Sequence, residues 1–187
     1  MGYIYVYTGT GAGKTTNALG LALRCVGHGK HAVIIQFLKW WKNIGEYKIR
    51  DKLKPYYEIY QFGRPGWIKV KNGETKVVRI NNHVFHVRSV NELDKKLCEK
   101  GLEFARQIML RKKPTLLVLD EINLAVKWKL IDVDKVLELL DSVPERTHVV
   151  LTGRYAHRKI IERADFVNVI VERKSPKEMV TTQGIQY

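Results

Sequence analysis

Hydrophobic and polar residues alternate along the chain in a way that predicts strands and helices in turn. The clearest strand is the Leu-Leu-Val-Leu run at residues 116–119, which is apolar at every position, as expected where both faces are covered. The predicted strands span residues 3–7, 32–37, 57–62, 115–120, 147–152 and 166–172, and the predicted helices span residues 15–27, 89–112, 132–142 and 155–163. Because strands and helices alternate, we expect a single α/β domain over residues 1–187, with a mainly parallel β-sheet flanked by helices.

Residues 67–88 do not fit this alternation. The pair Asn72-Gly73 separates two extended stretches and favours a type I′ hairpin turn, so we expect a small antiparallel β-meander inserted into the domain. His83 and His86 lie within this insertion. A spacing of three along a strand places two side chains on opposite faces, so we do not expect them to share a metal ion.

The predicted helices carry two further signals. Ser89 followed by Glu92 matches a capping box, which predicts that the helix 89–112 begins at Ser89. Cys25 and Cys98 lie on apolar faces of predicted helices, and the sequence has no Cys-x-x-Cys motif. We therefore expect two inert core thiols and no disulfide.

Positive charge is in large excess. Lysine and arginine number 33 against 19 acidic residues, a net charge of +14, and half of the excess (11 basic against 4 acidic residues) lies within residues 39–80. Such a balance favours polyanionic partners: nucleic acid, anionic lipid, or nucleotide and carboxylate ligands. No apolar stretch approaches the roughly 18 residues of a membrane span, and the N-terminus shows no targeting leader, so we expect a cytoplasmic protein.

The strongest chemical signal lies between the first predicted strand and the first predicted helix. The sequence there reads Thr8-Gly9-Thr10-Gly11-Ala12-Gly13-Lys14-Thr15-Thr16, a phosphate-binding loop in which Thr8 replaces the usual first glycine. In such a loop the backbone N–H groups of residues 9–16 converge on phosphate oxygens at the positive end of the following helix. We expect Lys14, on an exposed loop, to reach the phosphates and the Thr15 hydroxyl to bind Mg²⁺. The sequence thus predicts a P-loop NTPase-like fold that binds a nucleoside triphosphate.

Charged residues stand at the ends of two other predicted strands. Asp120 and Glu121 follow the apolar run, and we expect Asp120 to hold Mg²⁺, directly or through water, while Glu121 could orient a water or a ribose hydroxyl. Arg154 ends the strand 147–152 at the same edge of the sheet and is a candidate phosphate ligand. The alternatives are an acidic helix cap for the two carboxylates and a surface ion pair for Arg154.

Aromatic residues concentrate in the region that the alternation explains least. They are Trp40, Trp41, Tyr56, Tyr57, Phe62 and Trp67. Core packing accounts for most of them, but adjacent residues on a strand or helix cannot share one face, so Trp40 or Trp41 should meet solvent, a ligand or a second chain.

Together these motifs resemble those of one P-loop family, the ATP:corrinoid adenosyltransferases of cobalamin biosynthesis. The matching segments are residues 7–16, 18–24 and 27–30, Gln36-Phe37-Leu38-Lys39, Gly45-Glu46, Asp120-Glu121-Ile122-Asn123, Leu151-Thr152-Gly153-Arg154, Ala164-Asp165 and residues 183–187. They follow the family's order, and Thr8 before Gly9 is the family's form of the loop. Ala12 departs from the pattern, since the family usually has lysine there, and the insertion at 67–88 is not a familiar part of it.

The resemblance implies an unusual use of the loop. Family members do not hydrolyse ATP: a reduced Co(I) corrinoid attacks the 5′-carbon, the whole triphosphate leaves, and ATP is thought to lie reversed in the loop. Lys14, Mg²⁺ on Thr15 and Asp120, and Arg154 would stabilise the leaving triphosphate, and Glu121 would complete the catalytic set with Lys14 and Thr15.

The resemblance also implies a corrinoid side to the site. Family members use aromatic side chains to displace the lower axial ligand of cobalt, and Phe62 and Trp67 lie in the corresponding stretch. The expected partners are the corrinoid substrate, a flavoprotein reductase that supplies Co(I), and a second copy in a homodimer. We expect the basic stretch between Lys39 and Arg79 to bind corrinoid carboxylates. Two other functions stay open: a nucleic-acid-dependent ATPase, favoured by the charge and the loop, and a nucleotide or small-molecule kinase.

Overall fold

The structure of the protein, a computed structural model, describes residues 2–68, 77–80, 83–176 and 181–186. Its strands are β1 (Ile4–Thr8), β2 (Ala32–Phe37), β3 (Tyr57–Phe62), β4 (Trp67–Ile68), β5 (Val77–Ile80), β6 (His83–Arg88), β7 (Leu116–Asp120), β8 (His148–Thr152) and β9 (Phe166–Val169). Its helices are α1 (Lys14–Gly27), α2 (Gly45–Lys48), α3 (Glu92–Lys112), α4 (Ile122–Lys127), α5 (Val133–Asp141) and α6 (Arg158–Arg163), with a 3₁₀ turn at Ile49–Asp51. None of the helices in the described ranges is long and apolar enough to cross a membrane.

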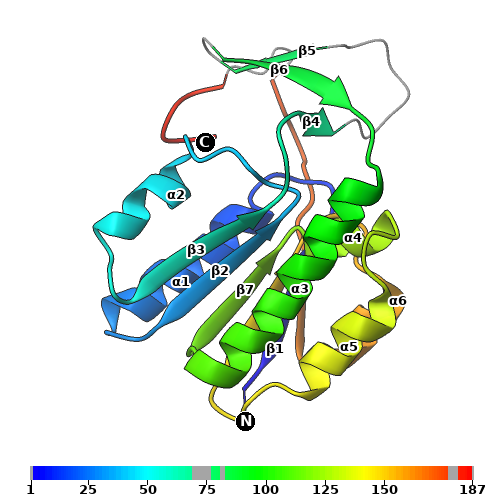
Figure 1. Ribbon diagram of the computed structural model, residues 1–187. Coiled ribbons are helices and arrows are strands. Elements are labelled where there is room, and N and C mark those ends of the chain that lie inside the picture. The colour runs from blue at the N-terminus through cyan, green and yellow to red at the C-terminus, as the bar shows by residue number, and fades with distance from the viewer. Residues whose placement is uncertain (1, 69–76, 81–82, 177–180, 187) are drawn as a thin grey trace.

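Six strands form one parallel sheet, in the order β3-β2-β7-β8-β1-β9. Helices cover both of its faces (Figure 1), with α1 on one side and α3 and α5 on the other. This confirms the predicted α/β class. Because all six strands run the same way, the ends of β1, β7 and β8 meet at one edge of the sheet.

The core follows from the strand sequences. Alternate residues of each central strand face opposite sides, so Ile34 and Val118 pack with Ala18 of α1, while Ile35 and Leu119 belong to the larger cluster beneath α3 and α5. All five of these side chains are at most 1% exposed. The continuous apolar runs are therefore explained by burial on both faces of the sheet.

Several boundaries differ from the predicted ones. The last strand ends at Val169 rather than at residue 172, and α6 begins at Arg158 rather than at residue 155 because His157 caps it, its side chain accepting from the N–H of Lys159. The short helices α2 and α4 were not predicted, since four and six residues are too few to show a helical period.

Helix α3 begins later than its first capping signal indicates. Asn91, not Ser89, is the N-cap: its side chain accepts from the N–H groups of Leu93 and Asp94, and Asp94 accepts from the N–H of Asn91 in return. The capping box is therefore Asn91 with Asp94, shifted by two residues, and it leaves the buried Asp94 carboxylate free to take further donors. The prediction based on Ser89 and Glu92 was wrong.

Within the predicted insertion, β4, β5 and β6 form a small mixed sheet in the order β4-β6-β5, drawn above the ends of the main strands in Figure 1. β5 and β6 are antiparallel, as predicted, but β4 pairs in parallel with β6, with Trp67 opposite Val87. A simple meander would place β5 in the middle. The predicted turn at Asn72-Gly73 lies outside the described residues.

Both cysteines are free thiols. Cys98 of α3 is fully buried, and Cys25 of α1 is half-buried beside the α1 face of the core. Burial raises the pKa of both, to about 12 for Cys98. A thiol with a raised pKa forms little of the reactive thiolate, which supports the expectation of inert cysteines.

Candidate active site

The predicted phosphate-binding residues Gly9 to Thr16 lie in the loop after β1 and in the first turn of α1, which begins at Lys14. The loop is packed against the chain that follows β9. A Cβ on Gly9 would lie 2.3 Å from the carbonyl oxygen of Ile170, and the backbone there has φ of 104°, which favours glycine. The N–H of Gly11 donates to the same oxygen at 2.9 Å. The path of the loop is thus fixed by its neighbours.

Lys14 is the first residue of α1 and is buried, contrary to the prediction of an exposed side chain. Its ammonium donates to the carbonyl oxygen of Gly11, inside the loop. Burial lowers the pKa of Lys14, the charge of Arg154 acts in the same direction, and the charge of Glu121 opposes both. Lys14 therefore interacts electrostatically with two other predicted site residues, Glu121 and Arg154.

Asp120 ends β7 beside the loop, and its side chain is fully buried. Its Oδ1 accepts from the hydroxyls of Thr15 at 2.8 Å and Thr152 at 2.6 Å, and its Oδ2 accepts from Nε2 of Gln36 at 3.0 Å. The two predicted Mg²⁺ ligands, Thr15 and Asp120, are therefore in direct contact. Thr152 and Gln36 were given no role, although a polar residue within an otherwise apolar strand is the signal that could have found them.

Lys39 lies against the same carboxylate. Its Nζ is 2.7 Å from Oδ2 of Asp120 and 3.3 Å from Oγ1 of Thr15. Burial disfavours the charge on Lys39, but the carboxylates of Asp120, Glu121 and Glu46 together outweigh burial and raise the pKa of the lysine. Burial also opposes the charge of Asp120, yet Lys39 holds the pKa of that carboxyl below its usual range. Nothing in the sequence spacing of Lys39 and Asp120 indicates this ion pair.

Glu121 follows Asp120 with its backbone in the left-handed region, at φ of 65°, where α4 begins. Its N–H donates to the hydroxyl of Thr152 at 3.0 Å. Its side chain makes no capping hydrogen bond to α4, a helix that is described throughout, so capping does not explain this carboxylate. Burial and the charge of Asp120 raise the pKa of Glu121. Arg154 is exposed at the end of β8 and exerts its charge on Glu121 and on Lys14.

A cavity of about 550 Å³ opens between this edge of the sheet and the small sheet. Lys39 and Glu121 line it from the side of the loop. Much of the remaining wall is aromatic, and the rings come from segments far apart in the sequence: Trp40, Trp41, Trp67, Phe85 and Trp128.

Phe85 of β6 is the centre of the aromatic wall. Its ring centroid lies 5.5 Å from that of Trp40 and 5.1 Å from that of Trp41, both edge to face, and 6.4 Å from that of Trp67. Trp40 and Trp41 both line the cavity, which adjacent residues can do here because residues 39–43 form neither a strand nor a helix. Trp67 is 46% exposed and offers a large apolar face to a ligand.

Phe62, the second residue that the resemblance assigns to the corrinoid, has a different environment. Its ring packs against Phe104 of α3 at 5.5 Å, and its side chain lies 3.0 Å from where a Cβ on Gly101 would stand. Phe62, the last residue of β3, therefore points towards α3 and is not among the residues that line the cavity. The structure gives no support to its predicted contact with the corrinoid.

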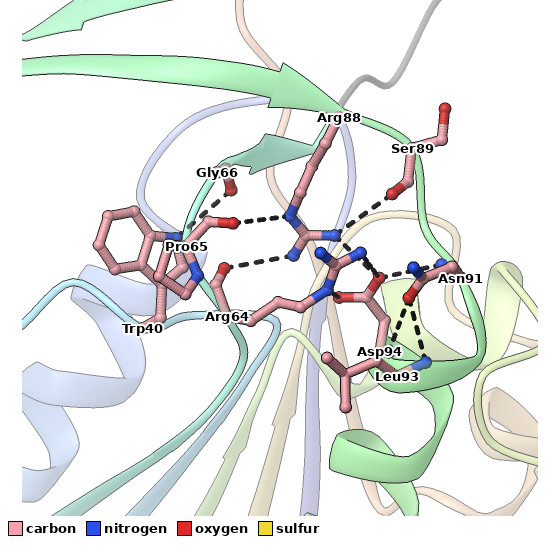
Figure 2. Close-up of polar contacts among 9 residues, drawn as sticks. All are labelled: Trp40, Arg64, Pro65, Gly66, Arg88, Ser89, Asn91, Leu93 and Asp94. Carbon is pink, nitrogen blue, oxygen red and sulfur yellow. Dashed lines mark hydrogen bonds and ion pairs between the residues drawn. The ribbon is translucent and has the colours of Figure 1, made fainter.

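Asp94 ties the small sheet to α3 (Figure 2). Its fully buried carboxylate accepts from Nε and Nη2 of Arg64 at 3.2 and 3.0 Å, from Nη1 of Arg88 at 2.8 Å, and from the N–H of Asn91 at 2.9 Å. Arg88 also donates to the carbonyl oxygens of Pro65 and Arg64, at 3.0 and 3.2 Å. We call Arg64, Arg88 and Asp94 the Asp94 cluster.

The Asp94 cluster reaches the aromatic wall through Gly66. The indole N–H of Trp40 donates to the carbonyl oxygen of Gly66 at 3.4 Å. Gly66 has φ of 112°, and a Cβ there would lie 2.7 Å from Cδ of Arg88, so only glycine fits beneath that side chain. The cluster thus fixes the chain immediately before Trp67.

One of the two histidines of the insertion, His83, contacts neighbouring side chains at the edge of the aromatic wall. His83 stands edge to face with Trp41 at 5.2 Å, and its ring lies 3.4 Å from the side-chain amide of Asn43. Across the described parts of the chain, no three His, Cys, Asp or Glu side chains are grouped to hold a metal.

A glycine-rich loop that opens a helix after the first strand of a parallel sheet, with a buried aspartate bonded to the threonine that follows its lysine, defines a P-loop nucleotide-binding protein. The fold is similar to that of the KaiC-like protein PH0186 from Pyrococcus horikoshii OT3, with a TM-score of 0.55 and 17% identity over 94% of this chain and 74% of that one. The chain belongs to the ATP:corrinoid adenosyltransferase family BtuR/CobO/CobP, whose model matches residues 1–187.

Individual relatives agree with the family. The corrinoid adenosyltransferase of a Sinorhizobium species is 31% identical over 100% of this chain and 80% of its own length. Corrinoid adenosyltransferase CobA of Salmonella typhimurium (strain LT2) is 32% identical over 100% of this chain and 86% of its own length, and the Escherichia coli K12 enzyme is 32% identical over 89% and 75%. The resemblance found in the motifs is confirmed, and a nucleic-acid-dependent ATPase is not favoured.

Proposed function

We propose that this protein transfers the 5′-deoxyadenosyl group of ATP to the cobalt of a reduced Co(I) corrinoid and releases triphosphate. The observation that carries the proposal is that the wall of the aromatic cavity lies beside the phosphate-binding loop, since Lys39 of that wall contacts Thr15. Lys39 and Glu121 line the cavity, and both act electrostatically on Asp120, which accepts from Thr15 of the loop. A nucleotide held by the loop would therefore border a large, mainly apolar cavity of the kind that binds organic cofactors.

The proposed step needs no general base. The cobalt electron pair attacks the 5′-carbon, a cobalt–carbon bond forms, and the carbon–oxygen bond breaks with its electron pair leaving on the triphosphate. The protein has to hold the triphosphate and stabilise its growing charge. Lys14 and the N–H groups of the loop would supply most of that stabilisation, and Arg154, whose charge already acts on Lys14, would add to it.

Thr15 and Asp120 fit a magnesium ion. Mg²⁺ binds oxygen ligands and, in nucleotide sites, takes one or two from the protein and others from phosphate and water. The hydroxyl and carboxylate oxygens lie 2.8 Å apart, and the ammonium of Lys39 already contacts both, so the position accepts positive charge. When bound, the ion would stabilise negative charge on the triphosphate. Thr152 and Gln36 would orient the Asp120 carboxylate for this role.

The cavity side is proposed to hold the corrinoid. Trp67 would meet the macrocycle and help to exclude the lower axial ligand of cobalt, since its ring is exposed in the cavity wall and its backbone follows the segment that the Asp94 cluster fixes. Glu121, at the border of the two regions, would bind a ribose hydroxyl. The reductase, the homodimer and the cytoplasmic location stay predictions.

Product analysis tests the proposal. The protein is incubated with ATP, Mg²⁺ and chemically reduced cobalamin, and the products are separated. We expect equal amounts of triphosphate and of a corrinoid product that carries a light-sensitive adenosyl–cobalt bond. Release of ADP and phosphate at a comparable rate without corrinoid would overturn the proposal, and stimulation of that release by single-stranded DNA would favour the nucleic-acid-dependent ATPase instead.

A further inference from the structure

Lys39 occupies the place where the proposed metal would bind. Its Nζ contacts both candidate ligands, Oδ2 of Asp120 at 2.7 Å and Oγ1 of Thr15 at 3.3 Å. The Asp120 side chain has no exposed surface, whereas that of Lys39 is 28% exposed. The lysine can therefore withdraw towards solvent, while the carboxylate cannot move away from its other partners.

The backbone before Lys39 explains how the side chain reaches this point. β2 ends at Phe37, and Leu38 adopts the left-handed region at φ of 63°, which is uncommon for leucine. The N–H of Leu38 donates to the carbonyl oxygen of Phe62 at 3.0 Å, which holds the turn against β3. After this turn Lys39 points back to Asp120, and Trp40 continues into the cavity wall.

We propose that Lys39 holds the divalent-cation position while the nucleotide site is empty and yields it only to a metal that arrives with triphosphate. A buried carboxylate with no opposite charge is costly, and Lys39 removes that cost in the free protein. A bare metal ion would have to displace an ammonium that is already paired. A metal–triphosphate complex brings new anionic oxygens with which the displaced ammonium can pair, so the exchange leaves no charge without a partner.

This inference rests on the proposed magnesium site of Thr15 and Asp120, and its test has a readout that does not depend on turnover. Mn²⁺ replaces Mg²⁺ as the probe, and free Mn²⁺ is measured by electron paramagnetic resonance without nucleotide. We expect weak binding to the unmodified protein and binding at least tenfold tighter to Lys39→Gln. Adding Asp120→Asn to Lys39→Gln should abolish that gain, which would place the ion at Asp120.

Two further variants make the comparison specific. Lys39→Arg keeps the positive charge and should bind Mn²⁺ as weakly as the unmodified protein. Lys42→Gln removes a neighbouring exposed lysine that lies over the Tyr47 ring at 5.8 Å, and it should change nothing. Circular dichroism checks that each variant is folded. If Lys39→Gln does not fold, Lys39→Met provides a second variant without the positive charge.

The failure of the inference and the failure of the metal site give different results. If the unmodified protein binds ATP equally well in Mg²⁺ and in EDTA, the proposed magnesium site is wrong. If ATP binding does require Mg²⁺ but Lys39→Gln and Lys39→Met bind Mn²⁺ no more tightly than the unmodified protein, Lys39 does not hold the cation position and the inference is overturned.

Discussion

The two sides of the active site are built in different ways. The nucleotide side consists of one continuous loop, residues 9–16, and of residues at the ends of adjacent parallel strands, so the main sheet itself brings Thr15, Asp120 and Thr152 together. The cavity side consists of aromatic rings from segments far apart in the sequence. Part of its wall belongs to the small sheet, which is joined to α3 through Asp94. The first arrangement is set by the topology of the fold, and the second by a few long-range polar contacts.

This difference has consequences for what mutations do. A change on the nucleotide side removes a charge or a ligand from a rigid frame and should alter chemistry more than folding. A change in the Asp94 cluster weakens the attachment of the small sheet, which carries part of the cavity wall, to α3. Such a change should therefore alter stability and corrinoid binding together.

Lys14→Ala should lower turnover by about 10²–10³-fold, because one preorganised electrostatic contact to the leaving group is lost. The ammonium bonds only within its own loop among the described contacts, so the thermal transition should move little. Steady-state rates of adenosylcobalamin formation and a melting curve check both parts. A variant that keeps a near-normal rate would show that Lys14 is not at the leaving group.

Asp94→Asn should lower the free energy of unfolding by about 3 kcal/mol at neutral pH, since it removes a buried carboxylate from two arginines. Burial would raise the pKa of Asp94, but Arg88 and Arg64 more than offset it and hold the pKa below its usual range. The contribution is therefore complete above about pH 4 and is lost as the pH falls through the folded-state pKa.

Denaturant unfolding at a series of pH values measures this difference. The gap between the unmodified protein and Asp94→Asn should shrink below about pH 4. The control is Asp51→Asn, which removes an exposed partner of Lys54 and should leave stability almost unchanged. A gap that stays constant down to pH 2 would rule out an ionised Asp94 as its source.

Trp67→Ala should slow the reaction from Co(II) corrinoid by about tenfold, the order expected for one lost aromatic contact, and should affect the reaction from supplied Co(I) less. The reason is that an apolar wall that excludes the axial ligand eases reduction, not attack on ATP. Tyr56→Ala is the control, because its ring packs on His31 and not in the cavity wall. Equal losses in both assays would mean that Trp67 only binds the corrinoid or packs.

Arg79→Ala should raise the KM for a corrinoid with free carboxylates by roughly twofold and leave that for cobalamin unchanged, as expected of one exposed charge pair. Arg79 is exposed and lines the cavity. Because exposed pairs are screened over about 10 Å at 0.1 M salt, the difference should disappear in a salt series. Parallel salt curves for the two corrinoids would reject charge selection by this residue.

Sequence reasoning predicted the two regions unequally, for physical reasons. The loop and the strand that ends at Asp120 are local patterns, so they were found together with the parallel sheet. Lys39 and Asp120 are 81 positions apart in the sequence, and Arg64 and Arg88 lie 30 and 6 positions before Asp94. No local period of the sequence encodes these contacts. For Phe62 the sequence indicated a role that the structure does not support. Its place in a motif did not say on which face of β3 its ring would lie.

A pair of affinity titrations on two variants tests the division of the site most directly. Calorimetric binding of Mg·ATP and of a Co(II) corrinoid is compared for Lys14→Ala and Trp67→Ala, each shown to be folded. We predict that Lys14→Ala weakens only the binding of ATP and that Trp67→Ala weakens only the binding of the corrinoid. If both variants weaken the same ligand, or if Trp67→Ala weakens ATP alone, the loop and the cavity are not separate substrate sites.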